Sequence, residues 1–354
     1  MRLRLHRFPL TKAVPLAISR GTTTAVEHLL VELEHEGRIG RGETGGFDTG
    51  HRAFSTDAIA AELEHLAPQL ECLEPQPLQA LEPLLAALSP PARCGLDLAL
   101  HDWWGQRLEQ PLHRLWGLDP GACVATSVTL GLGEPSAVLA RLERWRLQLP
   151  STRIKLKLGS PDGLDHDRAL VQAVRAALRP GDELQIDANG GWTLEGARQM
   201  IPWLADQEVV LVEQPLPPQN DREADTAGFA ALKGLAPIPL VADESCWDLR
   251  DLLRLAPHVD GINIKLVKCG GLSEGLLMAR TARRLGLGVM LGCYSDGGLL
   301  NSAAAQLLPL VRWPDLDSHL NLVDDPFAGP ERHGDLLQPA ERQGLGAQQL
   351  QEVG

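Results

Sequence analysis

The sequence predicts an α/β fold, with an eight-stranded parallel barrel that follows a separate α+β domain. From about residue 123 onward, short aliphatic and β-branched runs alternate with segments of helical apolar periodicity, which indicates parallel strands joined by crossover helices. The expected strands are 124–130, 153–158, 184–187, 209–213, 238–243, 261–265, 287–292 and a weaker one near 311–317. Eight such units suffice to close a barrel, and an open doubly wound sheet is the alternative.

Helical periodicity fills the gaps between these strands. It is clearest over residues 165–178, 194–204, 247–255, 272–285 and 299–308. Because each helical segment separates two expected strands, the order along the chain is the one that a covered parallel sheet requires.

The first part of the chain has a different pattern. Residues 24–33 and 37–44 predict a pair of strands around Glu36-Gly37, and residues 55–70 and 92–108 predict helices. We therefore expect an α+β domain over residues 1–117 and the barrel over residues 118–324. The tail after the barrel is rich in Pro, Gly and Gln and shows no clear element.

The composition argues against several classes of protein. The 354 residues carry a formal net charge of −13 and are 4% aromatic, so they would repel a phosphate backbone and offer few rings to stack on bases. Pro9, Lys12 and Pro15 interrupt any signal-peptide core, and no stretch approaches the roughly 20 apolar residues of a membrane span. The six cysteines form no CxxC pair, which indicates reduced thiols. We expect a cytoplasmic protein without nucleic-acid or membrane partners.

One glycine motif does not carry the function that its pattern suggests. The segment GRGETG at residues 40–45 satisfies GxGxxG after an expected strand, but further glycines and Asp48 follow where a helix should begin. A dinucleotide site needs the complete strand–turn–helix unit. We therefore interpret the segment as a hairpin and loop whose glycines serve turn geometry.

Five consecutive expected strands end in an ionisable residue. These residues are Lys157, Asp187, Glu213, Asp243 and Lys265, and successive members are 22 to 30 residues apart, which is one strand–helix unit. Any one of them could be a helix cap or a solvated lysine. Five ionisable residues at the same ends of consecutive strands, however, indicate an active site, because catalytic groups gather at that end of such barrels.

The strand order suggests a role for each of the five. The three carboxylates come from neighbouring strands and would repel one another without a cation, and a ligand set of oxygens suits Mg²⁺ or Mn²⁺. Lys157 and Lys265 lie four strands apart, on opposite sides of the barrel mouth. A lysine with a lowered pKa can act as a base, so two opposed lysines suit removal of a proton from one face of a carbon and its return to the other.

The motifs around these residues resemble the enolase superfamily, in its muconate-lactonising subgroup, and most of all the dipeptide epimerases. The segments that carry the resemblance are RIKLKLG, IDANGGW, LVEQPLP, VADESC and NIKLVKCGG, and GRIGRGETG and LDLALHDWWGQ resemble the N-terminal capping domain. The resemblance implies a (β/α)7β TIM-like barrel under a capping domain formed by residues 1–117 and rejoined by residues 325–354.

The resemblance also implies roles for individual residues. Lys157 and Lys265 would be the two acid–bases, and Mg²⁺, one per subunit with Mn²⁺ as a substitute, would be held by three carboxylates. Those metal ligands would be Asp187, Glu213 and Asp243. Substrate contacts would come from Arg20, Thr129, Lys155, Cys293, Asp315 and Asp317.

Two of these contacts suggest a substrate. Asp315 and Asp317 form a DxD pair on the last strand, opposite the metal site, and resemble the pair that holds the α-ammonium of a dipeptide. Arg20 resembles a specificity-loop residue, and its guanidinium could pair with the side-chain carboxylate of a substrate glutamate. L-Ala-D/L-Glu is therefore the leading substrate, with peptidoglycan recycling as the implied setting.

Three alternatives stay open at the level of sequence. o-Succinylbenzoate synthesis and muconate cycloisomerisation use the same scaffold, but their anionic substrates lack an ammonium group for the DxD pair. A barrel that binds a ligand without turnover would not need the complete set of strand-end residues. The sequence leaves self-association undecided.

Overall fold

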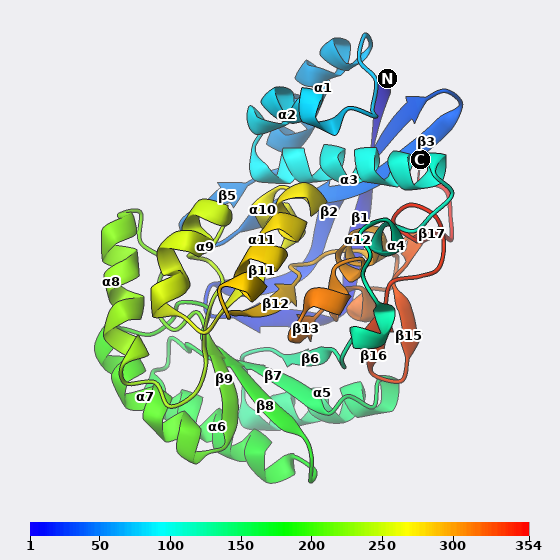
Figure 1. Ribbon diagram of the computed structural model, residues 1–354. Coiled ribbons are helices and arrows are strands. Elements are labelled where there is room, and N and C mark those ends of the chain that lie inside the picture. The colour runs from blue at the N-terminus through cyan, green and yellow to red at the C-terminus, as the bar shows by residue number, and fades with distance from the viewer. Residues whose placement is uncertain (354) are drawn as a thin grey trace.

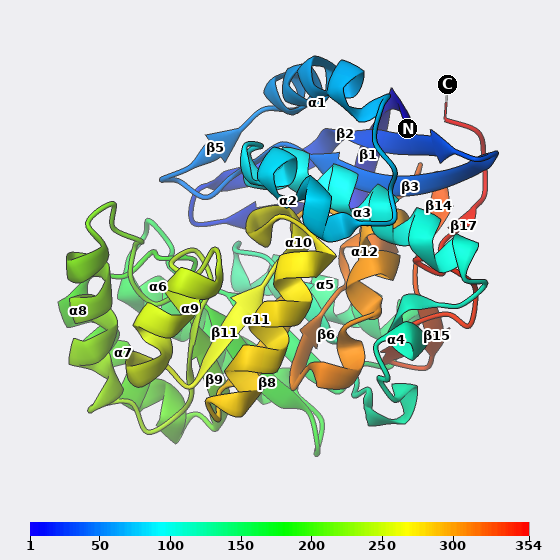
Figure 2. The ribbon, with the colours of Figure 1, turned by 45° about the horizontal axis from the view of Figure 1, so that its top comes forward.

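The computed structural model describes residues 1–353 and consists of a barrel beneath a smaller cap (Figure 1). Figure 2 shows the sheet of the cap and helices α1–α3 lying across one end of the barrel. Within the described residues, no helix is long and apolar enough to cross a membrane.

The cap is built on an antiparallel sheet in the order β1-β2-β3. Its strands are β1 (Arg2–Ile18), β2 (Gly21–His35) and β3 (Arg38–Gly45), and the short β4 (Phe47–Asp48) and β5 (Ala53–Phe54) follow. The helices are α1 (Thr56–Leu70), α2 (Leu78–Ala86), α3 (Pro90–Arg107) and the single turn α4 (Leu112–Leu115). Leu29, Val31 and Leu33 of β2 pack with Ile59 and Leu63 of α1 in one buried cluster, which holds helices and sheet together.

The glycines of the GxGxxG segment lie in strand β3 and pack against α3. A Cβ atom at Gly40 would lie 2.1 Å from the carbonyl oxygen of Ala99, and one at Gly42 would lie 2.1 Å from that of Gly95. The expectation that these glycines serve a turn is therefore wrong, because they allow the helix to approach the strand. The short strands β4 and β5, and not a helix, come directly after the motif, in agreement with the interpretation that it is not a dinucleotide site.

The barrel contains the eight expected strands in sequence order, from β6 to β13. They are β6 (Ser127–Leu130), β7 (Arg153–Lys157), β8 (Glu183–Asp187), β9 (Val209–Glu213), β10 (Leu240–Ala242), β11 (Gly261–Ile264), β12 (Gly288–Gly292) and β13 (Trp313–Asp315). All neighbouring pairs are parallel. The hydroxyl of Ser127 donates to Asp315 at 2.7 Å and joins β6 to β13, the two ends of this order. The structure thus confirms the predicted barrel over the open sheet.

Helices cover the outside of the barrel. The larger ones are α5 (Pro135–Gln148), α6 (Leu164–Ala177), α7 (Leu194–Asp206), α8 (Arg222–Lys233), α9 (Leu249–Leu255), α11 (Leu272–Arg284) and α12 (Gly298–Ala305), and α10 (Leu266–Cys269) is one turn. Short 3-10 helices are η1 (Pro120–Ala122), η2 (Ala256–His258), η3 (Leu308–Leu310) and η4 (Ser318–Asn321). The helices bury the outer faces of the strands in two apolar clusters. The strand ends at the mouth of the barrel are therefore left for polar groups.

The tail contains short strands that the sequence did not indicate. They are β14 (Phe327–Ala328), β15 (Glu331–His333), β16 (Leu336–Gln338) and β17 (Gln348–Gln349). The backbone N–H of Leu345 donates to Asp102 of α3 at 2.9 Å, and the N–H of Leu112 donates to Gly344 at 3.2 Å. The tail therefore contacts the helices of the cap. The division of the chain at residues 117 and 325 stays a prediction.

A half-buried carboxyl beside the start of α12 makes stability depend on pH. Asp325 accepts hydrogen bonds from the N–H groups of Gly298 and Phe327 at 2.6 and 2.9 Å. Burial, together with the nearby charge of Glu43, raises the pKa of Asp325 to about 7. A carboxyl with a raised pKa in the folded state stabilises the fold at low pH, and this contribution is lost as pH rises toward 7.

We therefore expect Asp325→Asn to weaken the fall of stability between pH 5 and pH 8. One such group changes the free energy of unfolding by at most about 1.4 kcal/mol per pH unit. Melting temperatures of the variant and the parent across this range test the expectation, and Asp324→Asn, one residue earlier, is the control. Parallel pH profiles of parent and Asp325→Asn would contradict it.

Candidate active site

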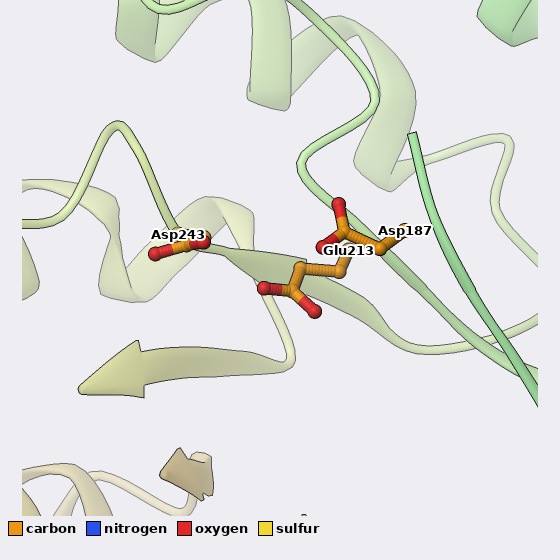
Figure 3. Close-up of side chains that lie close together, drawn as sticks. All are labelled: Asp187, Glu213 and Asp243. Carbon is orange, nitrogen blue, oxygen red and sulfur yellow. The ribbon is translucent and has the colours of Figure 1, made fainter. Parts of the chain in front are cut away.

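Three carboxylates converge at the mouth of the barrel. Asp187 and Glu213 end the adjacent strands β8 and β9 and are paired in register, and Asp243 directly follows β10. All three side chains are fully buried, and one carboxylate oxygen of each lies within 4.8 Å of the others (Figure 3). The parallel register of the strands brings together residues that are distant in sequence.

Four lysines surround the carboxylates. Lys157 Nζ lies 2.6 Å from Asp187, and Lys265 Nζ lies 2.7 Å from Asp243. The other two ammonium groups come from Lys155, 2.5 Å from Glu213, and Lys268, 2.6 Å from Asp243. Lys157 ends β7 and Lys265 directly follows β11, so the two lysines come from strands four apart in the order of the barrel.

The pKa values of the cluster depend on burial and on these ion pairs. Burial alone would raise the pKa of Asp187, but Lys157 and Lys155 lower it to about 2. Burial, with Asp187 nearby, raises the pKa of Glu213 to about 8. Burial alone would lower the pKa of Lys265, but the facing carboxylate of Asp243 raises it well above its usual value. A raised pKa is opposite to the lowered pKa expected for a lysine base, because the ammonium group of Lys265 is paired with the carboxylate of Asp243.

The chemistry of the donor set fits a hard divalent cation. Three fully buried carboxylates offer only oxygen ligands, which Mg²⁺ prefers. Each carboxylate is also oriented from outside: Asn263 Nδ2 donates to Glu213 at 2.7 Å, Lys268 to Asp243, and the backbone N–H of Asn189 to Asp187 at 2.8 Å. Such outer contacts fix the ligands of a metal site.

A second pair of acids lies on the far side of the mouth. Asp315 accepts from Lys155 at 2.6 Å, and Asp317 accepts from the backbone N–H of Thr129 at 2.6 Å. The thiol of Cys293 donates to the carbonyl oxygen of Asp315 at 3.1 Å. All five of these predicted contact residues thus lie together. Lys155 contacts both Glu213 and Asp315, so it links the two groups of acids.

Arg20 reaches the mouth from the turn between β1 and β2. Its guanidinium donates to the carbonyl oxygen of Asn189 at 2.8 Å and to the carboxylate of Glu244 at 3.0 Å. The sequence prediction missed Asn189, Glu244 and Lys268 as members of the site. They follow Asp187, Asp243 and Lys265 closely, but their contacts depend on the path of the loops, which no periodicity records.

Residues of the cap close a cavity of about 150 Å³ above the lysines. Lys157 and Lys265 line its floor, and the rings of Phe47 and Tyr294 stack in its wall with centroids 4.6 Å apart. Lys265 Nζ lies 4.1 Å from the centre of the Tyr294 ring. The two lysines therefore face a common space into which a substrate can extend.

Both parts of the chain match known domain families. Residues 3–117 match the model of the mandelate racemase / muconate lactonizing enzyme N-terminal domain, and residues 137–353 match the enolase C-terminal domain-like model. A protein of Flavobacteria bacterium strain MS024-2A named hydrophobic dipeptide epimerase is 38% identical over 98% of both chains.

Two solved structures with the same fold contain related enzymes. The L-Ala-D/L-Glu epimerase of Bacillus subtilis, in a substrate-liganded complex, has a TM-score of 0.89 and 27% identity over 98% of both chains. The dipeptide epimerase of Enterococcus faecalis complexed with Mg and L-Leu-L-Tyr has a TM-score of 0.88 and 30% identity over 98% of both chains.

Proposed function

Because the chain belongs to the mandelate racemase / muconate lactonizing enzyme family of the enolase superfamily, we propose that it is a Mg²⁺-dependent dipeptide epimerase. The observation that carries the proposal is the placement of Lys157 and Lys265 on opposite sides of the carboxylate cluster. A carbon held between a neutral lysine amine and a lysine ammonium group can lose a proton to the amine on one side and receive a proton from the ammonium group on the other. The reaction is inversion at the α-carbon of the C-terminal residue.

Each residue then has a specific task. Asp187, Glu213 and Asp243 would hold Mg²⁺, which supplies positive charge that binds the substrate carboxylate and favours loss of the α-proton. One lysine removes this proton and the other lysine protonates the opposite face. The three carboxylates have the same task in both directions of the reaction. The two lysines exchange roles when the direction is reversed.

Asp315 and Asp317 hold the other end of the substrate. Asp315 ends β13, four strands from β9 in the order of the barrel, and Asp317 follows it, so a dipeptide with its carboxylate at the metal would bring its α-ammonium toward these acids. A charged partner fixes the register of the α-carbon between the lysines. Thr129 and Cys293 support the acid pair from either side, through the contacts at 2.6 and 3.1 Å. Muconate and succinylbenzoate-type substrates lack the ammonium group, so this acid pair does not favour those activities.

The cellular setting is part of the proposal. The scattered cysteines support a cytoplasmic enzyme, and the net charge of −13 supports the absence of a nucleic-acid partner. Dipeptides released during peptidoglycan recycling are the substrate source that we propose.

A panel of small substrates tests the function. With Mg²⁺, we expect epimerisation of L-Ala dipeptides and no turnover of muconate or of the o-succinylbenzoate precursor. Chiral chromatography measures the epimerisation. N-acetylation of the dipeptide removes the ammonium and should lower kcat/KM by about 10–100-fold, the effect of losing a charged hydrogen-bond partner. Equal rates for free and N-acetylated dipeptides would contradict the role of Asp315 and Asp317.

A further inference from the structure

The relatives named above act on dipeptides of different chemical character, so the side chain that this chain accepts has to come from its own residues. We infer that the subsite for the C-terminal side chain takes an uncharged apolar group and excludes a carboxylate. This inference rests on the proposed function and specifies the substrate class of the same site.

The cavity above the lysines is the space available to that side chain. Its floor contains Lys157 and Lys265, between which the α-carbon lies, and its remaining wall comes mainly from the cap. The apolar residues in this wall are Leu16, Ile18, Val26, Phe47 and Tyr294. A side chain on the α-carbon therefore points toward aliphatic and aromatic groups, and their contact with an apolar side chain removes water from both.

The cations in the lining all have acidic partners. Lys157 is bound to Asp187 and Lys265 to Asp243, and both belong to the catalytic centre. Arg20 is the remaining cation, and it donates to Glu244 and to the carbonyl oxygen of Asn189. The lining also contains the acid Asp48. A substrate carboxylate would thus meet one acid and no unpaired cation in this cavity.

The pairing of Arg20 is fixed by burial. The side chain of Glu244 is only 1% exposed, whereas that of Arg20 is 24% exposed. If Arg20 turned to a substrate glutamate, it would leave Glu244 as a buried carboxylate without its cation, which proteins avoid. In the structure Arg20 therefore neutralises Glu244 and positions the loop after β8, in place of the substrate pairing expected from the sequence.

Relative kcat/KM values for four dipeptides test the inference. L-Ala-L-Leu and L-Ala-L-Phe are expected to exceed L-Ala-L-Glu by at least about 10-fold, and L-Ala-L-Gln, which matches glutamate in shape without its charge, should lie between them. An L-Ala-L-Glu value equal to or above that of L-Ala-L-Leu would overturn the inference and leave the proposed function intact. If none of the four is epimerised, the proposed function falls, and the inference with it.

Two arginine substitutions locate the subsite. Thr23 lines the cavity and is half-buried, and its neighbour Thr24 points to the other face of the same strand. Thr23→Arg adds a cation to the cavity and should raise the ratio of kcat/KM for L-Ala-L-Glu to that for L-Ala-L-Leu by at least about 10-fold, whereas Thr24→Arg should leave this ratio unchanged. Equal ratios in both variants would overturn the assignment of this cavity.

Substitution of Arg20 distinguishes a positioning role, through Glu244 and Asn189, from direct contact with the substrate carboxylate. Arg20→Met is expected to lower kcat/KM for L-Ala-L-Glu and L-Ala-L-Leu by the same factor, because Arg20 acts through Glu244 and Asn189. A loss confined to L-Ala-L-Glu would show that Arg20 contacts the substrate carboxylate, and would overturn the inference.

Discussion

Replacing Lys157 with methionine is expected to lower epimerisation in both directions by about 10²–10⁴-fold, the range typical of a positioned acid–base. Exchange of the α-proton with solvent should nevertheless persist for one epimer. In that epimer the α-proton faces Lys265, which can still remove a proton and return one on its own side. Chiral chromatography measures the first effect, and proton NMR in D₂O measures the second.

Lys265→Met provides the reciprocal test. It should lower epimerisation by a similar factor but preserve exchange in the other epimer, because the remaining base is now Lys157. Lys233→Met, which removes a lysine at the end of α8 and outside the site, is the control for general effects of the substitution. Small and equal losses of exchange from both epimers in both variants would argue against opposed bases.

Replacing Asp187 with asparagine is expected to lower kcat by at least about 10³-fold, because loss of a bound divalent cation removes several kcal/mol of charge stabilisation. Removal of divalent cations from the parent with a chelator should have the same effect. Mg²⁺ should restore the activity of the parent, and the Asp187→Asn variant should need a far higher Mg²⁺ concentration. Activity as a function of Mg²⁺ concentration is the measurement.

Glu183→Gln is the matched control for the metal prediction. Glu183 lies at the opposite end of β8, where it is exposed and 3.3 Å from Arg153, so its loss should leave the Mg²⁺ dependence unchanged. Full activity of the chelated parent, or an unchanged Mg²⁺ requirement in Asp187→Asn, would contradict the assignment of the three carboxylates.

The barrel was predictable because most of its strands carry a clear local signal, and only the last one, β13, was weak. β8 and β9 begin and end within a residue of the expected ranges, since buried parallel strands are short apolar runs bounded by polar residues. β1 was missed for a physical reason as well. Pro9 and Pro15 argue against a strand, but β1 is an edge strand with an irregular register between Thr11 and Leu16, where prolines are tolerated.

The site was predictable to the extent that parallel register determines it. Lys157, Asp187 and Glu213 all end barrel strands, so their meeting follows from the fold alone. The contact between Arg20 and Glu244 does not follow in this way, because it joins a turn of the cap to a loop of the barrel across 224 residues of sequence. The substrate contact of Arg20 came from the family resemblance and stays a prediction, and the partner that the structure shows for its guanidinium is Glu244.

The most direct test of the two-lysine arrangement is the fate of the α-proton in a single conversion. L-Ala-L-Leu incubated with the Mg²⁺-loaded enzyme in D₂O should yield L-Ala-D-Leu that carries deuterium at the α-carbon from the earliest time points, because the proton is returned by the lysine on the opposite face. An L,D product that retains the original protium would show that one group carries the proton across, and would contradict the proposed arrangement.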